Sequence, residues 1–157
     1  MVDMLVKLYD LPTDTAGPPD GITVRRAFAA EKHMVCEWVS RSFGRGWADE
    51  CGAAFCRQPI ACFVAAAESR LVGFCVYDAT ARGMAGPIGV ARDWQGHGAG
   101  RALLLAALCD MRASGYAYAV IGWVDAPAFF LRTCGAIAIE GSEPGPYRGI
   151  LKQRLLT

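Results

Sequence analysis

The sequence predicts a single α/β domain, of the α+β kind, in which helices flank a β-sheet. Short apolar runs with strand-like alternation recur along the chain and are interleaved with runs of helical periodicity. A glycine-rich segment, Gln95–Arg101, separates one strand-like run from one helix-like run. The 157 residues, 54% of them hydrophobic, suffice to bury one sizeable core. These three observations together predict one domain.

The first half of the chain is predicted to form strands, two helices and a hairpin. Met4–Tyr9 has the pattern of an extra N-terminal strand, and a loop rich in Pro, Gly and Asp follows it. We therefore separate an N-terminal extension, residues 1–21, from the main domain, residues 22–157. The predicted elements of this half are a strand at Ile22–Phe28, helices at Glu31–Phe43 and Trp47–Phe55, and strands at Ala61–Ala66 and Leu71–Tyr77, with a tight turn at Glu68–Arg70.

The second half alternates more regularly between strands and helices. Gly115 and Gly135 are typical residues just beyond a helix end, and Pro127 suits the first turn of a helix. The predicted elements are a strand at Ile88–Val90, a helix from Arg101 to about Ser114, a strand at Tyr116–Val124, a helix from Pro127, and last strands at Ile137–Ile139 and Ile150–Lys152.

The Gln95–Arg101 loop has the composition of a phosphate-binding turn. Its three glycines let the backbone approach a ligand closely, and the helix that follows presents amide groups and a positive dipole end. The spacing fits neither G-x-G-x-x-G, because the third glycine comes one residue early, nor a Walker loop, because no Lys-Ser/Thr pair follows. The segment is therefore predicted to bind a pyrophosphate of another kind.

The spacing Gln95-x-x-Gly98-x-Gly100, preceded by Gly89–Asp93, resembles the acyl-CoA loop of the GNAT superfamily, the acetyl-CoA-dependent N-acyltransferases. The predicted order of strands and helices is also similar to that family's, from about residue 22 to residue 156. The resemblance implies a mixed central sheet of about six to seven strands. It also implies that two neighbouring strands are splayed to admit the pantetheine arm.

The resemblance further implies that acetyl-CoA is the co-substrate. Backbone groups of Ile88, Gly89 and Val90 would pair with pantetheine, and the Val90 N–H would stabilise the developing oxyanion. Gly89 has a second interpretation, a β-bulge that splays the sheet. The other cofactor-binding residues that we expect are Gln95, Gly96, His97, Gly98, Ala99, Gly100, Arg101 and Phe130.

The expected catalytic acid is where the chain departs from the family. Many members carry a tyrosine four or five residues before the glycine that ends the penultimate helix, and here Leu131 and Phe130 hold those positions. Three explanations stay open: the thiolate leaves unassisted or through water, another tyrosine (Tyr147 or Tyr77) protonates it, or the chain binds acyl-CoA without catalysis. Asp125 is the candidate base, with helix N-cap as its alternative role.

The acceptor site is predicted from aromatic and acidic residues near the ends of elements. Its candidates are Trp47, Glu50, Tyr77, Asp78 and Trp123. The sequence thus predicts an N-acetyltransferase that acts by direct attack in a ternary complex. The acceptor is an amine of a small molecule or a peptide, and an acyl-CoA-binding module without catalysis is the alternative.

Composition narrows the class of partner and the compartment. A net charge of +1 does not favour nucleic-acid binding, and no apolar run reaches the ~18–20 residues of a membrane span. Charged residues interrupt the apolar N-terminus, so it does not resemble a signal peptide. Seven cysteines without a C-x-x-C pair argue against disulfides and metal sites and favour the cytoplasm. We also expect a homodimer, because the apolar content is high.

Overall fold

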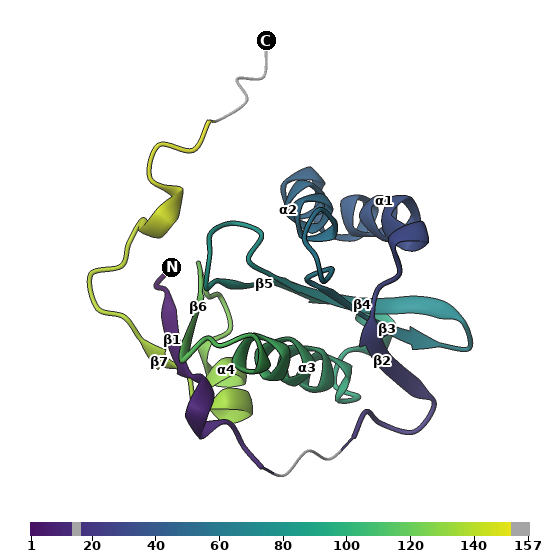
Figure 1. Ribbon diagram of the computed structural model, residues 1–157, viewed down its shortest axis with the longest axis horizontal. Helices are drawn as coiled ribbons and strands as arrows, with labels where there is room; N and C mark the ends of the chain where they lie inside the picture. Colours follow the sequence, from purple (N-terminus) through teal and green to yellow (C-terminus); the bar gives the residue numbers. More distant parts are fainter. Residues whose placement is uncertain (14–16, 152–157) are drawn as a thin grey trace.

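The computed structural model describes residues 1–13 and 17–151, which form a mixed α+β fold (Figure 1). Within these residues seven strands divide into two sheets, close to the predicted count of about six to seven strands with an extra N-terminal strand. The larger sheet is antiparallel and contains β2 (Ile22–Arg26), β3 (Cys62–Ala67), β4 (Arg70–Tyr77) and β5 (Ala85–Val90), in that order. The smaller contains β6 (Tyr118–Ile121), β1 (Met4–Lys7) and β7 (Ile137–Ala138), with β1 in the middle.

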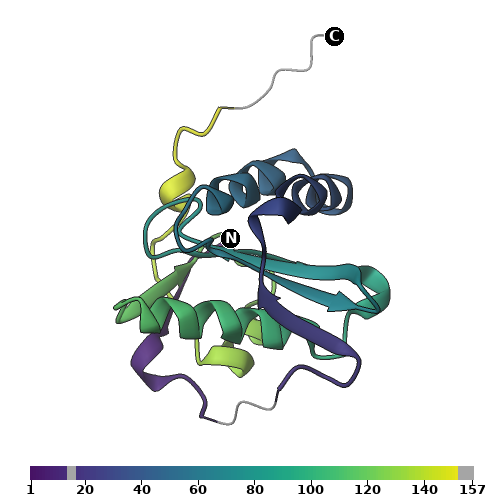
Figure 2. The same cartoon turned by 45° about the vertical axis from the view of Figure 1, so that its right-hand side comes forward.

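In the part of the chain that the structure describes, α-helices cover both faces of the larger sheet (Figures 1 and 2). The helices α1 (Lys32–Phe43) and α2 (Arg45–Phe55) lie on one face, and α3 (Ala99–Ala113) crosses the other, with α4 (Pro127–Cys134) beside it. Leu104 and Leu108 recur at helical spacing on α3 and are fully buried, as is Phe74 on β4. The core therefore lies between α3 and the sheet and continues beneath α1 and α2.

The N-terminal strand is part of this core. Leu5 of β1 pairs with Val120 of β6 on one side and with Ile137 of β7 on the other, antiparallel in both cases. Val6 and Leu8 are fully buried. The predicted extra strand is thus confirmed, and it packs within its own chain between β6 and β7.

The predicted strand at Ile150–Lys152 is wrong for the part that the structure describes. Ile150 and Leu151 have no strand structure, Leu151 is almost fully exposed, and Lys152 lies outside the described residues. The physical reason lies in β1, which already pairs with both β6 and β7. After β7 the chain turns at Gly141, which has a φ of 71°, and leaves the sheet.

A parallel β-bridge connects the two sheets, which then diverge. Met84, just before β5, forms a parallel bridge with Val120 of β6, and the Val120 N–H donates to the Gly83 carbonyl at 2.9 Å. Beyond this bridge β5 continues in the larger sheet and β6 in the smaller one (Figure 1). The splayed pair of strands that the family resemblance implies is therefore β5 and β6.

Gly89 is not the bulge that its place in the strand suggested. It pairs in register with Phe74, and the irregularity between β4 and β5 lies further back, between the pairs Cys75–Ile88 and Tyr77–Ala85. A Cβ atom on Gly89 would lie 2.6 Å from Cζ of Phe43. Gly89 is therefore required because the ring of α1 packs directly on the backbone of β5.

Replacing Gly89 by Ala should lower the free energy of unfolding by about 1–3 kcal/mol, because the new methyl group overlaps the Phe43 ring. Urea unfolding measures this loss. The matched control is Gly52→Ala within α2, whose Cβ would meet only the Cys36 sulfur at 3.9 Å. That change should raise stability by about 0.5–1 kcal/mol. Equal stability of the Gly89→Ala variant and the parent would contradict this account of the packing.

All seven cysteines are free thiols. Cys134 donates its Sγ–H to the Phe130 carbonyl at 3.2 Å, and burial raises its pKa to about 11. Burial likewise raises the pKa of Cys75 to about 12. These thiols are therefore protonated at neutral pH and act as packing residues. Among residues 1–13 and 17–151 no helix is long and apolar enough to span a bilayer.

Candidate functional site

The edge of β5 that faces β6 exposes backbone hydrogen-bonding groups. Ala91 donates its N–H to the Val72 carbonyl at 2.8 Å, so Val72 and Ala91 form a hydrogen-bonded pair. Such pairs alternate along an antiparallel ladder. Val90, opposite Gly73, therefore directs its N–H and C=O away from β4, and so does Ile88 opposite Cys75. These are the groups that can pair with pantetheine or contact a thioester oxygen.

The same alternation of hydrogen-bonded pairs argues against one predicted contact, the pairing of Gly89 with pantetheine. Gly89 pairs with Phe74, two residues from the bonded pair, so its N–H and C=O are directed to β4. Gly89 therefore cannot offer these groups to pantetheine, although Ile88 and Val90 can. The Val90 carbonyl accepts a bond from Gln95 Nε2 at 3.2 Å, which connects the strand edge to the glycine loop.

The glycine loop is shaped by positive φ angles at Gly96 (79°) and Gly98 (88°). Gly98 is the N-cap of α3, and its carbonyl accepts the Ala102 N–H at 3.1 Å, which begins the helix. The amides of Ala99 and Gly100 precede that first helical bond and lie at the positive end of the dipole of a fifteen-residue helix. This geometry suits a pyrophosphate, whose binding here stays a prediction.

His97 and Arg101, two other loop residues that were predicted to bind the cofactor, differ from each other in their surroundings. His97 Nδ1 lies 2.9 Å from the Gln95 carbonyl, and its ring stands edge-on to Trp94. His97 is thus engaged with the loop itself and is exposed. Arg101 is the third residue of α3 and is half-buried.

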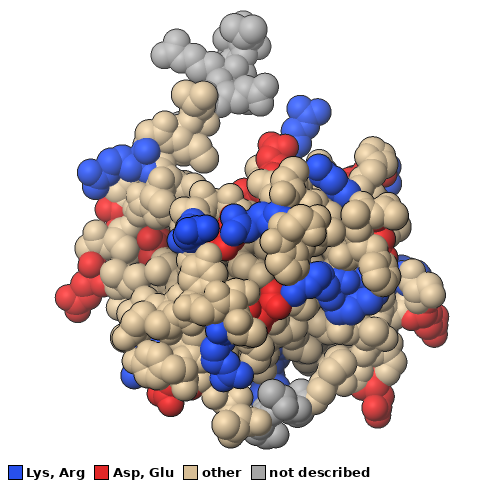
Figure 3. Space-filling model, in the orientation of Figure 1, with Lys and Arg blue, Asp and Glu red and all other residues tan. Residues whose placement is uncertain are grey.

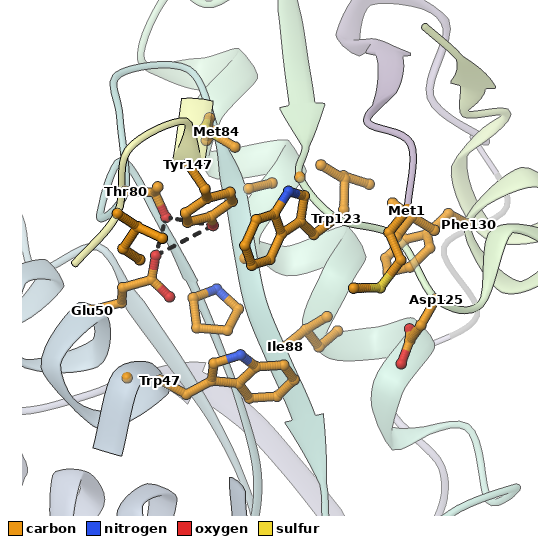
Figure 4. A pocket seen from close by; sticks show the side chains of 18 of the residues that line it. Met1, Trp47, Glu50, Thr80, Met84, Ile88, Trp123, Asp125, Phe130 and Tyr147 are labelled. Atoms are coloured by element: carbon orange, nitrogen blue, oxygen red, sulfur yellow. Dashed lines mark hydrogen bonds between the residues drawn. The ribbon is translucent and has the colours of Figure 1, made fainter. Parts of the chain in front are cut away.

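A pocket of about 580 Å³ occupies the space between the diverging strands and α2 (Figure 4). Ile88 and Phe130 line one part of it, and Glu50, Thr80 and Tyr147 line another. Figure 4 shows Phe130 and Asp125 on the opposite side of the pocket from Glu50 and Tyr147. The remaining lining residues are Met1, Gly46, Trp47, Asp49, Met84, Ala85, Gly86, Pro87, Ile121, Gly122, Trp123, Val124 and Ile150.

Glu50, on α2, is held by two hydroxyl groups. Thr80 and Tyr147 both donate to its Oε1 atom, the latter at 3.4 Å, and the two hydroxyl oxygens lie 3.3 Å apart. Burial raises the pKa of Tyr147, a rise that the Thr80 bond opposes and the charge of Glu50 reinforces. The phenol therefore stays protonated at neutral pH and can keep donating. Three elements far apart in sequence meet at this carboxylate.

Trp123 forms the wall between the two parts of the pocket. Its backbone has a φ of 48°, which is rare for a bulky residue and indicates that the surroundings enforce it. Its ring lies against Tyr147, with centroids 4.2 Å apart, and its Nε1–H donates to the Pro144 carbonyl at 2.8 Å. These contacts join the loop after β6 to the segment that follows β7.

Asp3 holds the backbone of Trp123 in place. Sequence reasoning did not assign this residue to the site. Its carboxylate is buried and accepts the Trp123 N–H at 3.0 Å. A Cβ on Gly145 would lie 2.8 Å from its Oδ2 atom, so the turn before Tyr147 packs directly on it. One signal in the sequence was available: Asp3 directly precedes an apolar strand-like run, and an acid that is buried there needs a partner.

Two predicted acceptor-binding residues lie elsewhere. Tyr77 donates to Asp110 at 2.6 Å, and Arg26 bonds the same carboxylate, so this cluster faces α3. Asp78 is buried, bonded by Tyr116 and by the Gly83 N–H and ion-paired with Arg57. Neither residue lines the pocket, and partners on other elements engage both side chains. Of the five candidates, Trp47, Glu50 and Trp123 do line it.

The position of the usual tyrosine is apolar in space as well as in sequence. Phe130 is buried and lines the pocket, and Leu131 is 56% exposed on the outer side of α4. Tyr147 lies across the pocket from Phe130 (Figure 4). Asp125 lines the pocket near Phe130, and it is not the helix cap, because Ala126 holds the N-cap position of α4 without a side-chain bond.

The pocket carries its own charge. Within residues 1–13 and 17–151 its lining includes three acids, Asp49, Glu50 and Asp125, and no Lys, Arg or His side chain. Met1, also in the lining, carries the N-terminal ammonium, which is ion-paired with Glu143. On the face drawn in Figure 3, acidic and basic residues are interspersed among the others. The negative charge of the pocket therefore comes from its own walls.

Comparison with known proteins agrees with this geometry. A family model described as "Acetyltransferase (GNAT) family" matches residues 32–136. No curated protein sequence is a significant match.

Solved structures are similar to the chain at low sequence identity. A GCN5-related N-acetyltransferase from Sphaerobacter thermophilus is 23% identical (TM-score 0.65), with 88% of this chain and 48% of that chain covered. A glucosamine N-acetyltransferase region of a fungal multi-domain GH3 β-N-acetylglucosaminidase is 15% identical (TM-score 0.68), with 88% and 19% covered. A GNAT acetyltransferase from Brucella melitensis in complex with acetyl-CoA is 17% identical (TM-score 0.56), with 75% and 86% covered. The chain thus spans half or less of the first two.

Proposed function

Since the chain belongs to the GNAT acetyltransferase family, we propose that it transfers an acetyl group from acetyl-CoA to the amine nitrogen of a small molecule or peptide. Transfer takes place by direct attack, with both substrates bound together. The observation that carries the proposal is that one pocket joins the open edge of β5 to a set of acidic residues. The donor and the acceptor can therefore meet between β5 and β6.

The residues of the chain divide the work between two regions. The amides at the start of α3 hold the pyrophosphate, and the open backbone groups of Ile88 and Val90 align pantetheine along β5. Bound there, acetyl-CoA supplies a thioester carbonyl as the electrophile. Attack by the amine forms the C–N bond as the C–S bond breaks. The Val90 N–H stabilises the negative charge that develops on the carbonyl oxygen.

Two protons must move during the transfer. Asp125, in the pocket wall beside Phe130, accepts the proton that the amine loses. The leaving thiolate is weakly basic, with a thiol pKa of about 8.5. It can therefore take its proton from solvent. No acid is then needed in place of the tyrosine whose position Phe130 holds. Tyr147 lies with Glu50, which favours a role in binding the acceptor.

The test is a kinetic assay with purified protein, acetyl-CoA and a panel of amines, read by thiol release and by the mass of the acetylated product. We expect release that depends on the amine and saturates. Initial rates at varied concentrations of both substrates should give intersecting double-reciprocal lines. Parallel lines would contradict direct attack. Binding of acetyl-CoA without release for any amine would instead favour the acyl-CoA-binding module, which Phe130 at the tyrosine position supports.

A further inference from the structure

We infer that the acceptor is a linear amine that carries a second cationic group, as a diamine does. The inference rests on the proposed function and adds to it the chemistry of the acceptor. It starts from the placement of the acids: Glu50 and Asp125 stand on opposite sides of the same pocket (Figure 4). One carboxylate lies beside Phe130, where the acyl group arrives, and the other lies where the far end of an acceptor would reach.

Glu50 is built as an anchor for a cation. Thr80 and Tyr147 both bond its Oε1 atom, which fixes the carboxylate on the wall of the pocket. In Figure 4 the second oxygen of Glu50 is turned toward the pocket, where an ammonium group can approach it. A charge-assisted bond of this kind is about twice as strong as a neutral one.

The aromatic walls of the pocket also favour a cationic acceptor. Trp47 is stacked on Phe43, with centroids 5.2 Å apart, and Trp123 is fixed by Tyr147 and by the Pro144 carbonyl. Both indole rings line the pocket and are partly exposed to it. Indole faces attract ammonium groups, and these two rings are held in place before any ligand binds.

The same lining disfavours an anionic acceptor. An amine with a carboxylate at its far end would place that charge beside Glu50, where the described lining residues offer no Lys, Arg or His side chain. The Met1 ammonium is already paired with Glu143. A neutral far end would leave Glu50 without an ionic partner. We therefore expect the second charge of the acceptor to set the order of reactivity: cation first, neutral next, anion last.

Three four-carbon amines that differ only at the far end test this order: 1,4-diaminobutane, 1-butylamine and 4-aminobutanoate. At saturating acetyl-CoA, kcat/KM for the diamine should exceed that for butylamine by about tenfold or more, and 4-aminobutanoate should be poorest. Calorimetric binding of the same amines in the presence of CoA should give the same order without turnover. Equal or reversed order of diamine and butylamine would overturn the inference.

Glu50→Gln assigns the effect to one residue. It should lower kcat/KM for the diamine by about tenfold and change the value for butylamine by less than about threefold. Glu37→Gln on α1, where Glu37 pairs with Arg41 away from the pocket, should leave both values unchanged. An equal loss for both amines would assign Glu50 to catalysis or folding and contradict the inference.

Failure of the proposed function has a different signature. In that case acetyl-CoA binds and no amine, charged or neutral, releases thiol. The inference about the acceptor would then fall with the function. If butylamine and the diamine release thiol equally, the proposed acetyl transfer stands and only the inferred second cationic group of the acceptor is contradicted.

Discussion

Replacing Gly98 by Ala is expected to weaken the binding of acetyl-CoA by about tenfold or more. Gly98 has a φ of 88°, which costs an L-residue about 1–2 kcal/mol, and an added Cβ would lie 2.9 Å from Cγ of Pro19. Because Gly98 is the N-cap of α3, relief of this strain must move the amides that are proposed to hold the pyrophosphate. Calorimetric titration with acetyl-CoA measures the loss directly.

The control for this prediction lies at the other end of the same helix. Gly115 follows α3, has a φ of 95°, and has open space where a Cβ would stand. Gly115→Ala therefore carries a similar backbone cost without touching the loop. It should lower thermal stability while leaving the Kd for acetyl-CoA unchanged. Equal affinity of the Gly98→Ala and Gly115→Ala variants would refute the assignment of the loop.

The second large effect is expected from Val90→Pro, which replaces the half-buried Val90 side chain and removes its backbone N–H. That group is directed away from β4, so its loss breaks no hydrogen bond of the sheet, and β5 is an edge strand where proline is tolerated. If the Val90 N–H stabilises the oxyanion, kcat should fall by about a hundredfold or more. Steady-state kinetics with acetyl-CoA and a reactive amine measures this change.

Ala91→Pro is the matched control one residue further along. Ala91 already has a φ of −52°, close to that of proline, and its N–H donates to the Val72 carbonyl. This variant should lose about 1–3 kcal/mol of stability and retain most of its kcat. If Val90→Pro loses stability and keeps its kcat instead, the oxyanion role of Val90 is wrong.

Local patterns in the sequence were sufficient for most of the fold. The helix at Lys32–Phe43 and the hairpin turn at Glu68 and Ser69, which both have positive φ angles, agree with apolar spacing and turn chemistry. The Gln95–Arg101 loop was predictable because the function proposed for it depends on backbone atoms and consecutive residues. Such features depend on a few neighbouring positions, and a sequence displays them directly.

The acceptor side could not be predicted in the same way. Glu50, Thr80 and Tyr147 meet from three elements, and no spacing in the chain announces their contact. Tyr77 and Asp78 were plausible candidates at a strand end, but partners on other elements, Asp110 and Arg57, engage them. Asp3 was missed for the same reason, since the place of β1 between β6 and β7 is a long-range property. Long-range pairing decides which side chains share a pocket.

The most direct test of the account is calorimetric titration of the parent protein with acetyl-CoA, with dephospho-CoA and a nicotinamide dinucleotide as comparators. We predict micromolar binding of acetyl-CoA at one site for each chain and no binding of the dinucleotide. Absence of acetyl-CoA binding, or equal binding of the dinucleotide, would contradict the assignment of the glycine loop and with it the proposed acetyl transfer.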